Sequence, residues 1–327
     1  MKKYNVAIVG IRGAVGQEML KILKERNFPY DQLKLISTSI DQSTIDEHGD
    51  TIEKIHEDSF KGVDIGLFSP GASVSKVWAP IAAKDGCIVI DNTSQFRMDP
   101  EVPLIVPEVN PEHIKDHKGI IANPNCSTIQ MVVALKPLHD YAKIKRIVVS
   151  TYQSVSGAGT EGITELIAQS TDDSLKPKKF QHRIAFNMIP HIDAPQDNLY
   201  TKEEIKMVNE TRKIFNDDSI GVTATCVRVP VIRAHSESIN IETQRKITRD
   251  KALELLSKAP GVTVIDDITK NEYPLPLNAA GKDDIFVGRI REDESIANGL
   301  NLWVVSDNLR KGAALNAIQI AEELIKI

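Results

Sequence analysis

Cysteine is scarce in this sequence, with three among 327 residues: Cys87, Cys126 and Cys226. They lie far apart and form neither a CxxC pair nor the spacing of a metal site. An odd, sparse count does not suit a secreted domain held by disulfides, and it fits a reducing compartment. We therefore expect no metal site and a cytoplasmic protein.

Long apolar runs are also lacking. No segment approaches the roughly 18 consecutive apolar residues that a membrane-spanning helix requires. The apolar run over residues 6–9 is too short for a secretory signal, and it leads into glycines. The formal net charge of -5 argues against a general attraction to nucleic acid. We expect neither a membrane nor a nucleic-acid partner, whereas a small anionic substrate remains compatible with local basic residues.

The length of 327 residues suggests two domains. Over residues 1–125, short apolar segments alternate with amphipathic ones, which is typical of βαβ units and predicts a mainly parallel sheet. The strands expected there are 4–9, 34–37, 63–68 and 87–91, and the expected helices are 15–26 and 72–83.

From residue 144 onward, strand-like segments follow one another more often, which predicts an α+β domain with a partly antiparallel sheet. A helix is expected over 127–141, and Pro137 should end or kink it. The segment 308–325 has the pattern of an amphipathic helix. The other expected strands are 147–153, 222–232, 238–243, 262–265, 285–290 and 300–306, with helices over 160–169, 202–215 and 250–258.

A glycine-rich turn joins the first expected strand to the first helix. Glycine lets the backbone approach a pyrophosphate closely, and the helix N-terminus behind it offers free N–H groups. The spacing is GxxGxxG, not the commoner GxGxxG, yet its position favours nucleotide binding over a plain tight turn. The expected cofactor contacts in this turn are Gly10, Arg12, Gly13, Ala14, Val15 and Gly16.

The end of the second strand should distinguish NAD from NADP. An acidic residue there binds the ribose 2′-OH of NAD, and an arginine binds the 2′-phosphate of NADP. Ser37 and Ser39 offer hydroxyls that suit a phosphate, whereas Asp41 argues the other way. We expect Ser37, Ser39 and Ile40 to contact the cofactor, and a solvated loop is the alternative.

Cys126 follows the turn formed by residues 123–125 and lies just before the helix expected from residue 127. A thiol at a helix N-terminus feels the helix dipole, which favours the nucleophilic thiolate. The alternative is a small buried cysteine, and we favour it for Cys87 and Cys226, which lie in strand-like apolar segments. Cys126 is therefore the candidate nucleophile.

His235 is the candidate proton partner of that thiol. It follows the strand-like segment 222–232, whereas most other histidines lie in polar stretches. An imidazole exchanges protons near neutral pH, as a thiol nucleophile requires. Sequence spacing alone does not bring His235 to Cys126.

Basic and amide side chains offer contacts for an anionic substrate. Arg97 follows a strand that ends at Asp91, so it borders the expected ligand crevice, where a guanidinium can hold phosphate or carboxylate. Lys206 is three residues after Glu203 on an expected helix, and from the residues alone a surface ion pair is the preferred interpretation. Gln153 precedes a loop over 154–159 that either contacts the nicotinamide or is a simple turn.

The order and spacing of these segments resemble the aspartate-semialdehyde dehydrogenase family over essentially the whole chain. The resemblance implies an α/β fold with a Rossmann-type doubly wound parallel sheet plus an α+β catalytic and dimerisation domain, as in glyceraldehyde-3-phosphate dehydrogenases. Residues 1–125 plus 308–327 would form the NADP-binding domain, 126–307 the catalytic and dimerisation domain, and the chain at least a homodimer. The similar segments are 10–16, 94–98, 123–128, 153–159, 203–206, 226–236 and 307–314.

The resemblance also implies a role for each site residue. Cys126 would be the acyl-thioester nucleophile and His235 the acid/base. Arg228 would hold the substrate carboxylate, Gln153 would orient the substrate and Glu203 would contact its amine. The phosphate site would comprise Arg97, Asn125 and Lys206, and further NADP contacts would come from Ser156, Gly157 and Asn308.

The implied reaction is the NADP-dependent reduction of L-4-aspartyl phosphate to L-aspartate 4-semialdehyde and inorganic phosphate, in lysine, threonine and methionine synthesis. The family often carries an arginine after the second strand, but residues 37–43 contain neither Arg nor Lys, and Arg12 stands where threonine is usual. Two alternatives stay open. One is a related reductase acting on N-acetyl-glutamyl phosphate or on the glyceraldehyde-3-phosphate pair, and the other is a non-catalytic NADP(H) sensor on the same fold.

Overall fold

The computed structural model describes residues 2–40, 44–45 and 51–327, which divide into two compact units. The first unit comprises residues 1–125 and 313–327, and the second comprises 126–312. Asp41, which bears on the cofactor prediction, lies outside the described residues. Residues 308–312, expected with the first unit, belong to the second, where Asn308 accepts hydrogen bonds from Ser154, Ser156 and Ala234.

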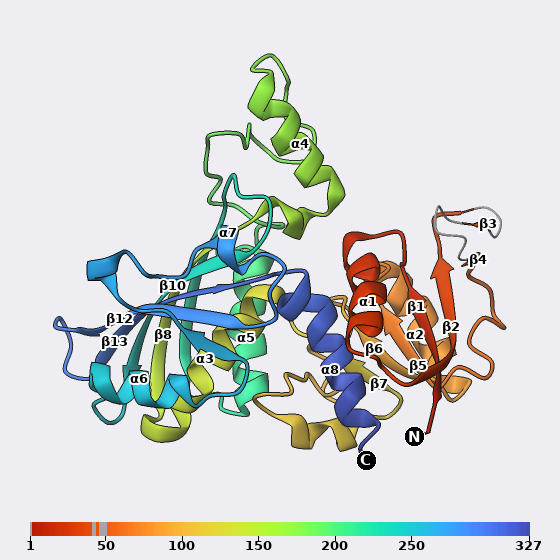
Figure 1. Cartoon of the computed structure of the whole chain (residues 1–327), viewed down its shortest axis with the longest axis horizontal. Coiled ribbons are helices and arrows are strands. Elements are labelled where there is room, and N and C mark those ends of the chain that lie inside the picture. Colours follow the sequence, from red (N-terminus) through yellow and green to blue (C-terminus); the bar gives the residue numbers. More distant parts are fainter. Residues whose placement is uncertain (1, 41–43, 46–50) are drawn as a thin grey trace. The chain divides into compact units, whose positions relative to one another are not determined.

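The first unit is built on a seven-stranded sheet (Figure 1). Its strands are β1 (Tyr4–Val9), β2 (Tyr30–Ser37), β3 (Thr44–Ile45), β4 (Thr51–Lys54), β5 (Ile65–Phe68), β6 (Ile88–Asp91) and β7 (Ile120–Ala122). The strand order is β3-β4-β2-β1-β5-β6-β7, and every neighbouring pair is parallel except β3 with β4. The predicted parallel sheet is therefore confirmed.

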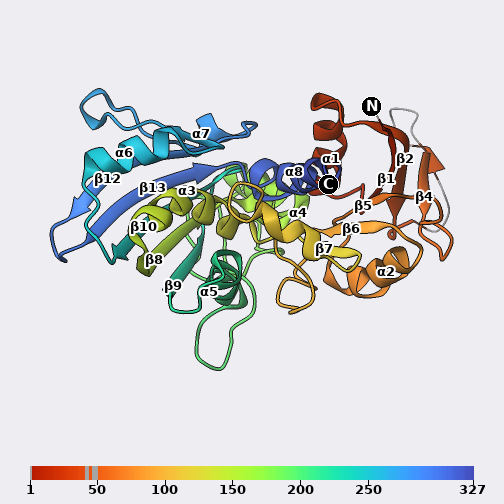
Figure 2. The same cartoon turned by 90° about the horizontal axis from the view of Figure 1, so that it is seen from below.

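Helices cover both faces of this sheet. Helices α1 (Ala14–Glu25) and α8 (Leu315–Leu324) pack on one face around Ile8 and Leu67. Helix α2 (Ala72–Lys84) packs on the opposite face around Val9, as Figure 2 shows. A short 3₁₀ helix, η1 (Pro111–Asp116), precedes β7. The sheet is doubly wound because apolar side chains point alternately to its two faces.

The second unit contains a six-stranded mixed sheet. Its strands are β8 (Ile144–Gln153), β9 (Gly221–Arg228), β10 (His235–Thr243), β11 (Val262–Val264), β12 (Ile285–Asp293) and β13 (Gly299–Ser306). In the order β11-β12-β13-β10-β8-β9, the three central pairings are antiparallel and the two outer pairings are parallel. The partly antiparallel sheet is as predicted. Helices α3 (Cys126–Ala142), α5 (Lys202–Phe215) and α6 (Arg249–Ser257) pack against it.

Two details of the second unit correct the sequence-based expectations. Helix α3 does not end at Pro137, because most of its residues are buried and that packing outweighs the backbone hydrogen bond that proline cannot make. The expected strand over 222–232 ends earlier, at Arg228, and the next strand begins earlier, at His235. Ala234 has a left-handed backbone (φ 74°), which turns the chain just before His235. Arg228 and His235 therefore both lie in strands and not in a connecting loop.

A helical excursion leaves the second unit after β8. It begins with the 3₁₀ turn η2 (Val155–Ala158), continues in α4 (Thr160–Thr171), and returns through an extended segment to α5. Figure 1 shows α4 standing away from the sheet of its own unit. Val155, Leu166, Ile184 and Ile189 give the excursion its own small core.

The C-terminal segment is less regular than the single helix expected over 308–325. A π-helical turn, η4 (Arg310–Ala314), precedes α8. Two other short elements, η3 (Ile268–Lys270) and α7 (Pro276–Ala279), lie between β11 and β12 and carried no clear sequence pattern. In the part of the chain that the structure describes, no helix has both the length and the apolar character to cross a membrane.

Replacing Gly10 by alanine should destabilise the first unit. Gly10 has a φ of 89°, and an added Cβ would lie 2.7 Å from the backbone of Ser69. Gly86 is a matched control, because its φ is 90° and an added Cβ there meets nothing within 4 Å.

We expect Gly86→Ala to lower the free energy of unfolding by about 1–2 kcal/mol through backbone strain. Gly10→Ala should cost about 1–3 kcal/mol more through overpacking. Urea unfolding of both variants measures the difference, and equal losses would contradict the close packing at Gly10.

Candidate active site

The glycine-rich turn of the first unit is tightly closed. The Gly10 carbonyl accepts a hydrogen bond from the Gly13 N–H at 3.0 Å, and a Cβ at Gly16 would lie 2.4 Å from that carbonyl oxygen. Gly13 precedes α1 without a side-chain cap, so the N–H groups of the first helical turn face outward for an anion. Ala14 and Val15 begin the helix. The turn has the geometry of a phosphate cradle.

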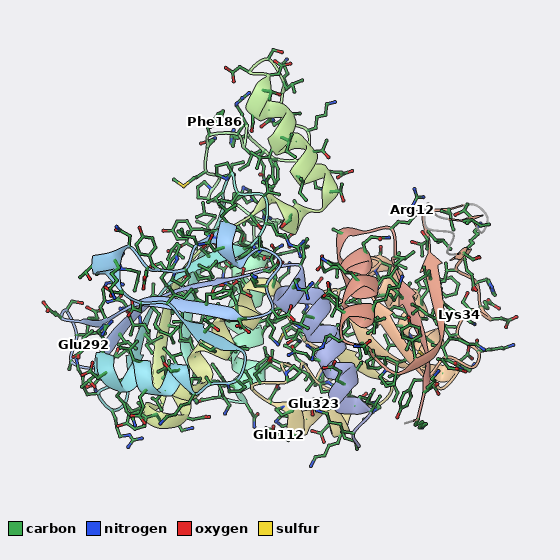
Figure 3. All side chains as sticks on the ribbon, in the orientation of Figure 1. Arg12, Lys34, Glu112, Phe186, Glu292 and Glu323 are labelled. Carbon is green, nitrogen blue, oxygen red and sulfur yellow. The ribbon has the colours of Figure 1, made fainter. Side chains whose placement is uncertain are left out.

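The end of β2 carries serine hydroxyls as expected. Ser37 is buried, its Oγ accepts from the Ser39 N–H at 3.2 Å, and the two Oγ atoms are 3.1 Å apart. Ile40 follows, partly buried. Arg12 is exposed, and Figure 3 shows its side chain projecting from the glycine-rich turn at the end of the first unit where β2 finishes. Arg12 is one basic group of this part of the first unit, and Lys54, which pairs with Ser37 across β4 and β2, is another.

Arg97 and Asn125 also belong to the first unit. Arg97 is buried, and its guanidinium donates to the carbonyl oxygens of Asn123 and Asn92, both at 2.9 Å. Asn123 is held in turn by Asn316 of α8, whose amide donates to Asn123 Oδ1 at 2.7 Å. These bonds attach Arg97 to the loop that carries Asn125.

Cys126 is the first residue of α3 in the second unit and is partly buried. The backbone of η4 packs directly against it, because a Cβ at Gly312 would lie 2.9 Å from the Cys126 Cβ. Arg228 and Cys126 interact electrostatically, so a cation and a helix N-terminus both favour the thiolate. Burial raises the pKa of Cys87 to about 12, and burial also raises the pKa of Cys226. Those two thiols stay protonated.

Gln153, Glu203 and Lys206 form one hydrogen-bonded chain. Gln153 Nε2 donates to Glu203 Oε1 at 3.1 Å, and Lys206 Nζ donates to Glu203 Oε2 at 3.0 Å and to Asp193 Oδ2 at 2.8 Å. Burial acts to lower the pKa of Lys206, but Glu203 and Asp193 outweigh it and raise that pKa. The expected Glu203–Lys206 pair is present, and its glutamate is buried, unlike a surface pair.

Arg228 and His235 lie at the same end of neighbouring strands. Arg228 pairs with Gln153 across β9 and β8, and β10, which begins with His235, borders β8 on the other side. Arg228 Nη1 donates to the Ser154 carbonyl at 2.7 Å, and its guanidinium faces the Phe180 ring of the excursion. Burial lowers the pKa of Arg228, while Glu203 opposes that shift. An arginine buried this deeply is suited to binding a carboxylate.

His235 is fully buried, and its Nδ1 accepts a hydrogen bond from the Ser154 N–H at 3.0 Å. Burial, and then the neighbouring Arg228, lower the pKa of His235 to about 3. The imidazole is therefore neutral at physiological pH.

Through these interactions the second unit brings together six of the predicted residues. The residues predicted to contact the nicotinamide, Ser156, Gly157 and Asn308, lie beside them. Ser156 Oγ donates to Asn308 Oδ1 at 3.0 Å, and a Cβ at Gly157 would meet both Arg228 and His235 within 3.3 Å. The six are Cys126, Gln153, Glu203, Lys206, Arg228 and His235. Lys206 is in the second unit, whereas Arg97 and Asn125 are in the first.

Sequence reasoning missed Ser154 and Asp307. Ser154 contacts both Arg228 and His235 through its backbone. Asp307 is fully buried and accepts from Arg233 at 2.6 Å and from the Gly281 N–H at 2.6 Å. Each residue lies inside a segment that resembled the family, and that position was the only signal of its role.

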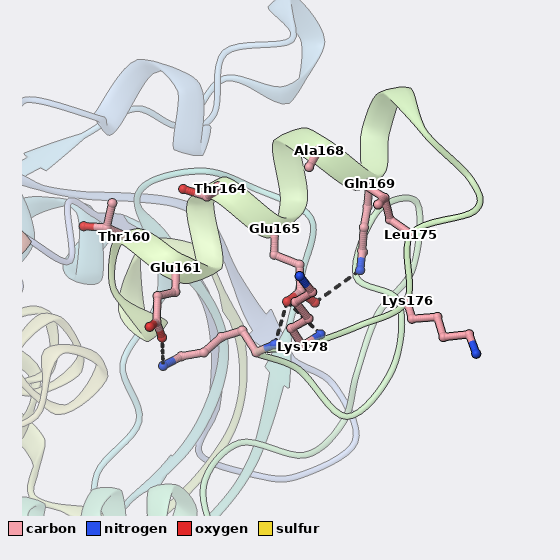
Figure 4. A pocket seen from close by; sticks show the side chains of 10 residues that line it. Thr160, Glu161, Thr164, Glu165, Ala168, Gln169, Leu175, Lys176 and Lys178 are labelled. Atoms are coloured by element: carbon pink, nitrogen blue, oxygen red, sulfur yellow. Dashed lines mark hydrogen bonds and ion pairs between the residues drawn. The ribbon is translucent and has the colours of Figure 1, made fainter.

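A hollow of about 570 Å³ lies elsewhere, along α4 (Figure 4). Glu165 accepts there from the backbone N–H groups of Lys178 and Lys179, and Lys179 Nζ pairs with Glu161 at 2.7 Å. Its lining carries charges of both signs and contains no predicted site residue. In the described ranges, no group of three His, Cys, Asp or Glu side chains is arranged to hold a metal.

Comparison with known proteins gives matches over nearly the whole chain. The profile of the semialdehyde dehydrogenase NAD binding domain matches residues 5–117, and that of the semialdehyde dehydrogenase dimerisation domain matches 135–311. The chain is 57% identical to an aspartate-semialdehyde dehydrogenase of Aquifex aeolicus, covering 99% of this chain and 98% of the relative. It is 52% identical to that of Bacillus subtilis, with the same coverage.

A solved structure agrees with these matches. The crystal structure of aspartate semialdehyde dehydrogenase II complexed with ASA, from Vibrio cholerae, superposes with a TM-score of 0.94 at 49% identity. The match covers 100% of this chain and 99% of that one.

Replacing Gly312 by alanine should displace Cys126, because the new Cβ would lie 2.9 Å from the Cys126 Cβ. A displacement of about 1 Å costs on the order of 100-fold in rate when it misplaces a reacting group. We expect that loss in kcat/KM, together with slower alkylation of Cys126 by iodoacetamide.

Gly221→Ala is the matched control, because its added Cβ meets only the Lys145 carbonyl, at 3.5 Å. Wild-type alkylation and turnover in Gly312→Ala would show that the π-helical turn does not position the thiol.

Proposed function

Because the chain belongs to the aspartate-semialdehyde dehydrogenase family, we propose that it catalyses the NADP-dependent reductive dephosphorylation of L-4-aspartyl phosphate to L-aspartate 4-semialdehyde. The observation that carries this proposal is the position of Cys126, at the N-terminus of α3 and in electrostatic contact with the buried Arg228. The product feeds the synthesis of lysine, threonine and methionine.

The reaction begins at the Cys126 thiolate. Its sulfur attacks the acyl carbon of the substrate, and inorganic phosphate departs with the electron pair of the C–O bond. A thioester remains on Cys126. The hydride that reduces the acyl carbon of this thioester would come from NADPH held at the glycine-rich turn. The resulting thiohemiacetal collapses, the C–S bond breaks, and the thiolate is restored as the aldehyde leaves. His235 serves the acyl oxygen as its acid/base partner.

Two charged side chains of the second unit match the α-carboxylate and the α-ammonium group of an amino acid. Arg228 binds the substrate α-carboxylate through its guanidinium, and Glu203 accepts from the α-ammonium group. Gln153 is hydrogen-bonded to Glu203, so it orients the reacting end of the same substrate. Arg97, Asn125 and Lys206 bind the phosphate group as cation and amide donors.

NADP is the cofactor of this proposal. Gly10, Gly13, Ala14, Val15 and Gly16 offer backbone N–H groups to its pyrophosphate, as the tight turn before α1 supports.

The 2′-phosphate is bound by Arg12 with the hydroxyls of Ser37 and Ser39, and Ile40 packs against the adenosine. Ser156, Gly157 and Asn308 contact the nicotinamide end. Asn308 Oδ1 already accepts from Ser154, Ser156 and Ala234, so donation to the cofactor comes from its Nδ2.

The assembly is a homodimer formed by the second unit, whose residues 135–311 match a dimerisation-domain profile. The compartment is the cytoplasm, which agrees with three cysteines that are all free thiols.

The decisive assay measures phosphate-dependent NADPH formation from L-aspartate 4-semialdehyde, with NADP and with NAD. N-acetyl-glutamate semialdehyde and glyceraldehyde 3-phosphate serve as competing substrates. No turnover of aspartate semialdehyde with either cofactor would overturn the proposal.

Removing the nucleophile should abolish the reaction. In Cys126→Ala we expect at least a roughly 10⁴-fold loss of kcat, because no other group forms the thioester. Cys226→Ala is the control, since its buried thiol stays protonated. Unchanged circular dichroism of both variants shows that the fold survives, and substantial turnover by Cys126→Ala excludes Cys126 as the nucleophile.

Removing the cation at the cofactor site should change cofactor preference. We expect Arg12→Ala to raise the KM for NADP about tenfold, equal to roughly 1.4 kcal/mol, and to leave the KM for NAD almost unchanged. Lys21→Ala removes an exposed cation of α1, paired with Glu25 at 3.7 Å, and is the control. Equal changes for both cofactors in Arg12→Ala would show that Arg12 does not contact the 2′-phosphate.

A further inference from the structure

Ser154, the residue that follows β8, connects the buried histidine to the buried arginine. Its N–H donates to His235 Nδ1 at 3.0 Å, and its carbonyl accepts from Arg228 Nη1 at 2.7 Å. Its hydroxyl donates to Asn308 Oδ1 at 3.1 Å. All four residues are buried, so these bonds are made away from water.

The direction of the bond to His235 determines where that imidazole carries its proton. A backbone N–H can only donate, so Nδ1 must be the acceptor and cannot carry a hydrogen. The proton of the neutral ring is therefore on Nε2. The opposite tautomer would place two N–H groups 3.0 Å apart in a fully buried site. The Ser154 hydroxyl is also 3.0 Å from Nδ1, but its one proton is donated to Asn308 Oδ1, so the backbone N–H is the donor to that nitrogen.

The backbone around His235 holds the ring in this orientation. Ala234 has a φ of 74°, a conformation that alanine seldom adopts, and its N–H donates to Asn308 Oδ1 at 3.0 Å. The same Oδ1 accepts from Ser154 and Ser156. Asn308 therefore joins the segment before His235 to the loop that carries Ser154. Strain held in this way at a site is a sign that the orientation is needed.

The Nε2 atom lies beside the guanidinium that is proposed to bind the substrate carboxylate. A Cβ at Gly157 would lie 2.9 Å from Arg228 Nη1 and 3.3 Å from His235 Nε2, so both nitrogens border the same point. Among the residues that the structure describes, Nε2 has no hydrogen-bond partner. The Nε2–H donor of His235 therefore lies beside the guanidinium of Arg228.

We propose that His235 acts as a neutral hydrogen-bond donor from Nε2 to the acyl oxygen, and that Ser154 is the positioning residue that sets this tautomer. The inference rests on the proposed thioester reaction and narrows the acid/base role of His235 to that of a donor. It also implies that Cys126 ionises without His235, through the α3 N-terminus and Arg228.

The proton balance of the reaction supports a donor that keeps its proton. Thiolate attack places negative charge on the acyl oxygen, and the charge leaves with the phosphate as the carbonyl re-forms. Hydride addition restores the oxyanion, and breaking the C–S bond returns its electron pair to sulfur. The one proton that the overall reaction consumes comes from water and ends on the phosphate. The acyl oxygen thus needs a hydrogen bond and no proton transfer.

The groups around His235 agree with a permanently neutral ring. Burial and the Arg228 guanidinium lower its pKa to about 3, while the Glu203 carboxylate and the Ala234 backbone act in the opposite direction. Protonation of the ring is thus confined to pH values far below neutrality.

The first test is spectroscopic and needs no turnover. Nitrogen-15 NMR of the histidine-labelled holoenzyme, with His235→Gln to assign the resonances, should show Nδ1 unprotonated and Nε2 protonated from about pH 6 to 9. In uniformly nitrogen-15-labelled enzyme, a scalar coupling between the Ser154 amide nitrogen and Nδ1 identifies the hydrogen bond. The other seven histidines are internal references. A protonated Nδ1, or a titration of His235 in this range, overturns the proposal.

The second test is kinetic. His235→Gln keeps an N–H donor that does not titrate, whereas His235→Ala removes the donor. We expect the Gln variant to retain kcat at least tenfold above the Ala variant, and its kcat to have the same pH dependence as wild type. Equal kcat values in the two variants would contradict the donor role.

Ser154→Ala tests the positioning residue while keeping the backbone N–H. We expect the Nε2 tautomer to persist and kcat to fall less than fivefold, as for the control Ser150→Ala in β8. A change of tautomer would show that the hydroxyl, and not the N–H, controls the ring. If the enzyme does not turn over aspartate semialdehyde, the proposed function fails, while the NMR result still decides the tautomer.

Discussion

The catalytic unit depends on one buried corner of the chain, at Asp307 and Asn308. The Asp307 carboxylate accepts from Arg233, from the Gly281 N–H and from two N–H groups of the turn that follows it. Its carbonyl accepts from the Gly312 N–H, which holds η4 against Cys126. Buried polar groups are stable only when they are satisfied in this way. A loss at this corner would therefore disturb Cys126 and His235 together.

The charged groups of the second unit stabilise one another through electrostatic interactions. Glu203 lies between Lys206 and Gln153 and counters the buried charge of Arg228. A buried guanidinium without such a partner would carry a large desolvation cost. The same cation acts on Cys126 and helps keep His235 neutral. One buried arginine thus acts on both the Cys126 thiol and the His235 imidazole.

Much of the architecture could be predicted, because strand and helix periodicity reflects burial directly. The bounds of β1 and α5 agree with prediction to the residue, since apolar patterning and a Thr201–Glu204 capping box define them. The end of β9 at Arg228 has a local signal in Pro230, which cannot donate to a strand ladder, whereas the left-handed Ala234 that turns the chain before His235 has no local signature. The continuation of helix α3 through Pro137 could not be predicted either, because packing along the sheet compensates for the backbone hydrogen bond that proline cannot make.

For the site, chemistry was easier to predict than geometry. A cysteine at a helix start and an arginine after a strand are local features that a sequence displays. The bonds that Ser154 makes from its backbone are not, because every residue except proline has both an N–H and a carbonyl. Such interactions become visible only when β8, β9 and β10 are brought side by side.

The left-handed Ala234 has a consequence for anyone who re-engineers this protein. Glycine adopts that conformation without strain, so Ala234→Gly is an obvious substitution to consider for thermal stability. The substitution would also make the turn before His235 more flexible, and it would increase the conformational entropy of the unfolded chain. Compared with glycine, alanine at this position lowers folding stability and fixes the direction of the imidazole. Stabilising changes are therefore better sought away from this turn, in loops that no catalytic group depends on.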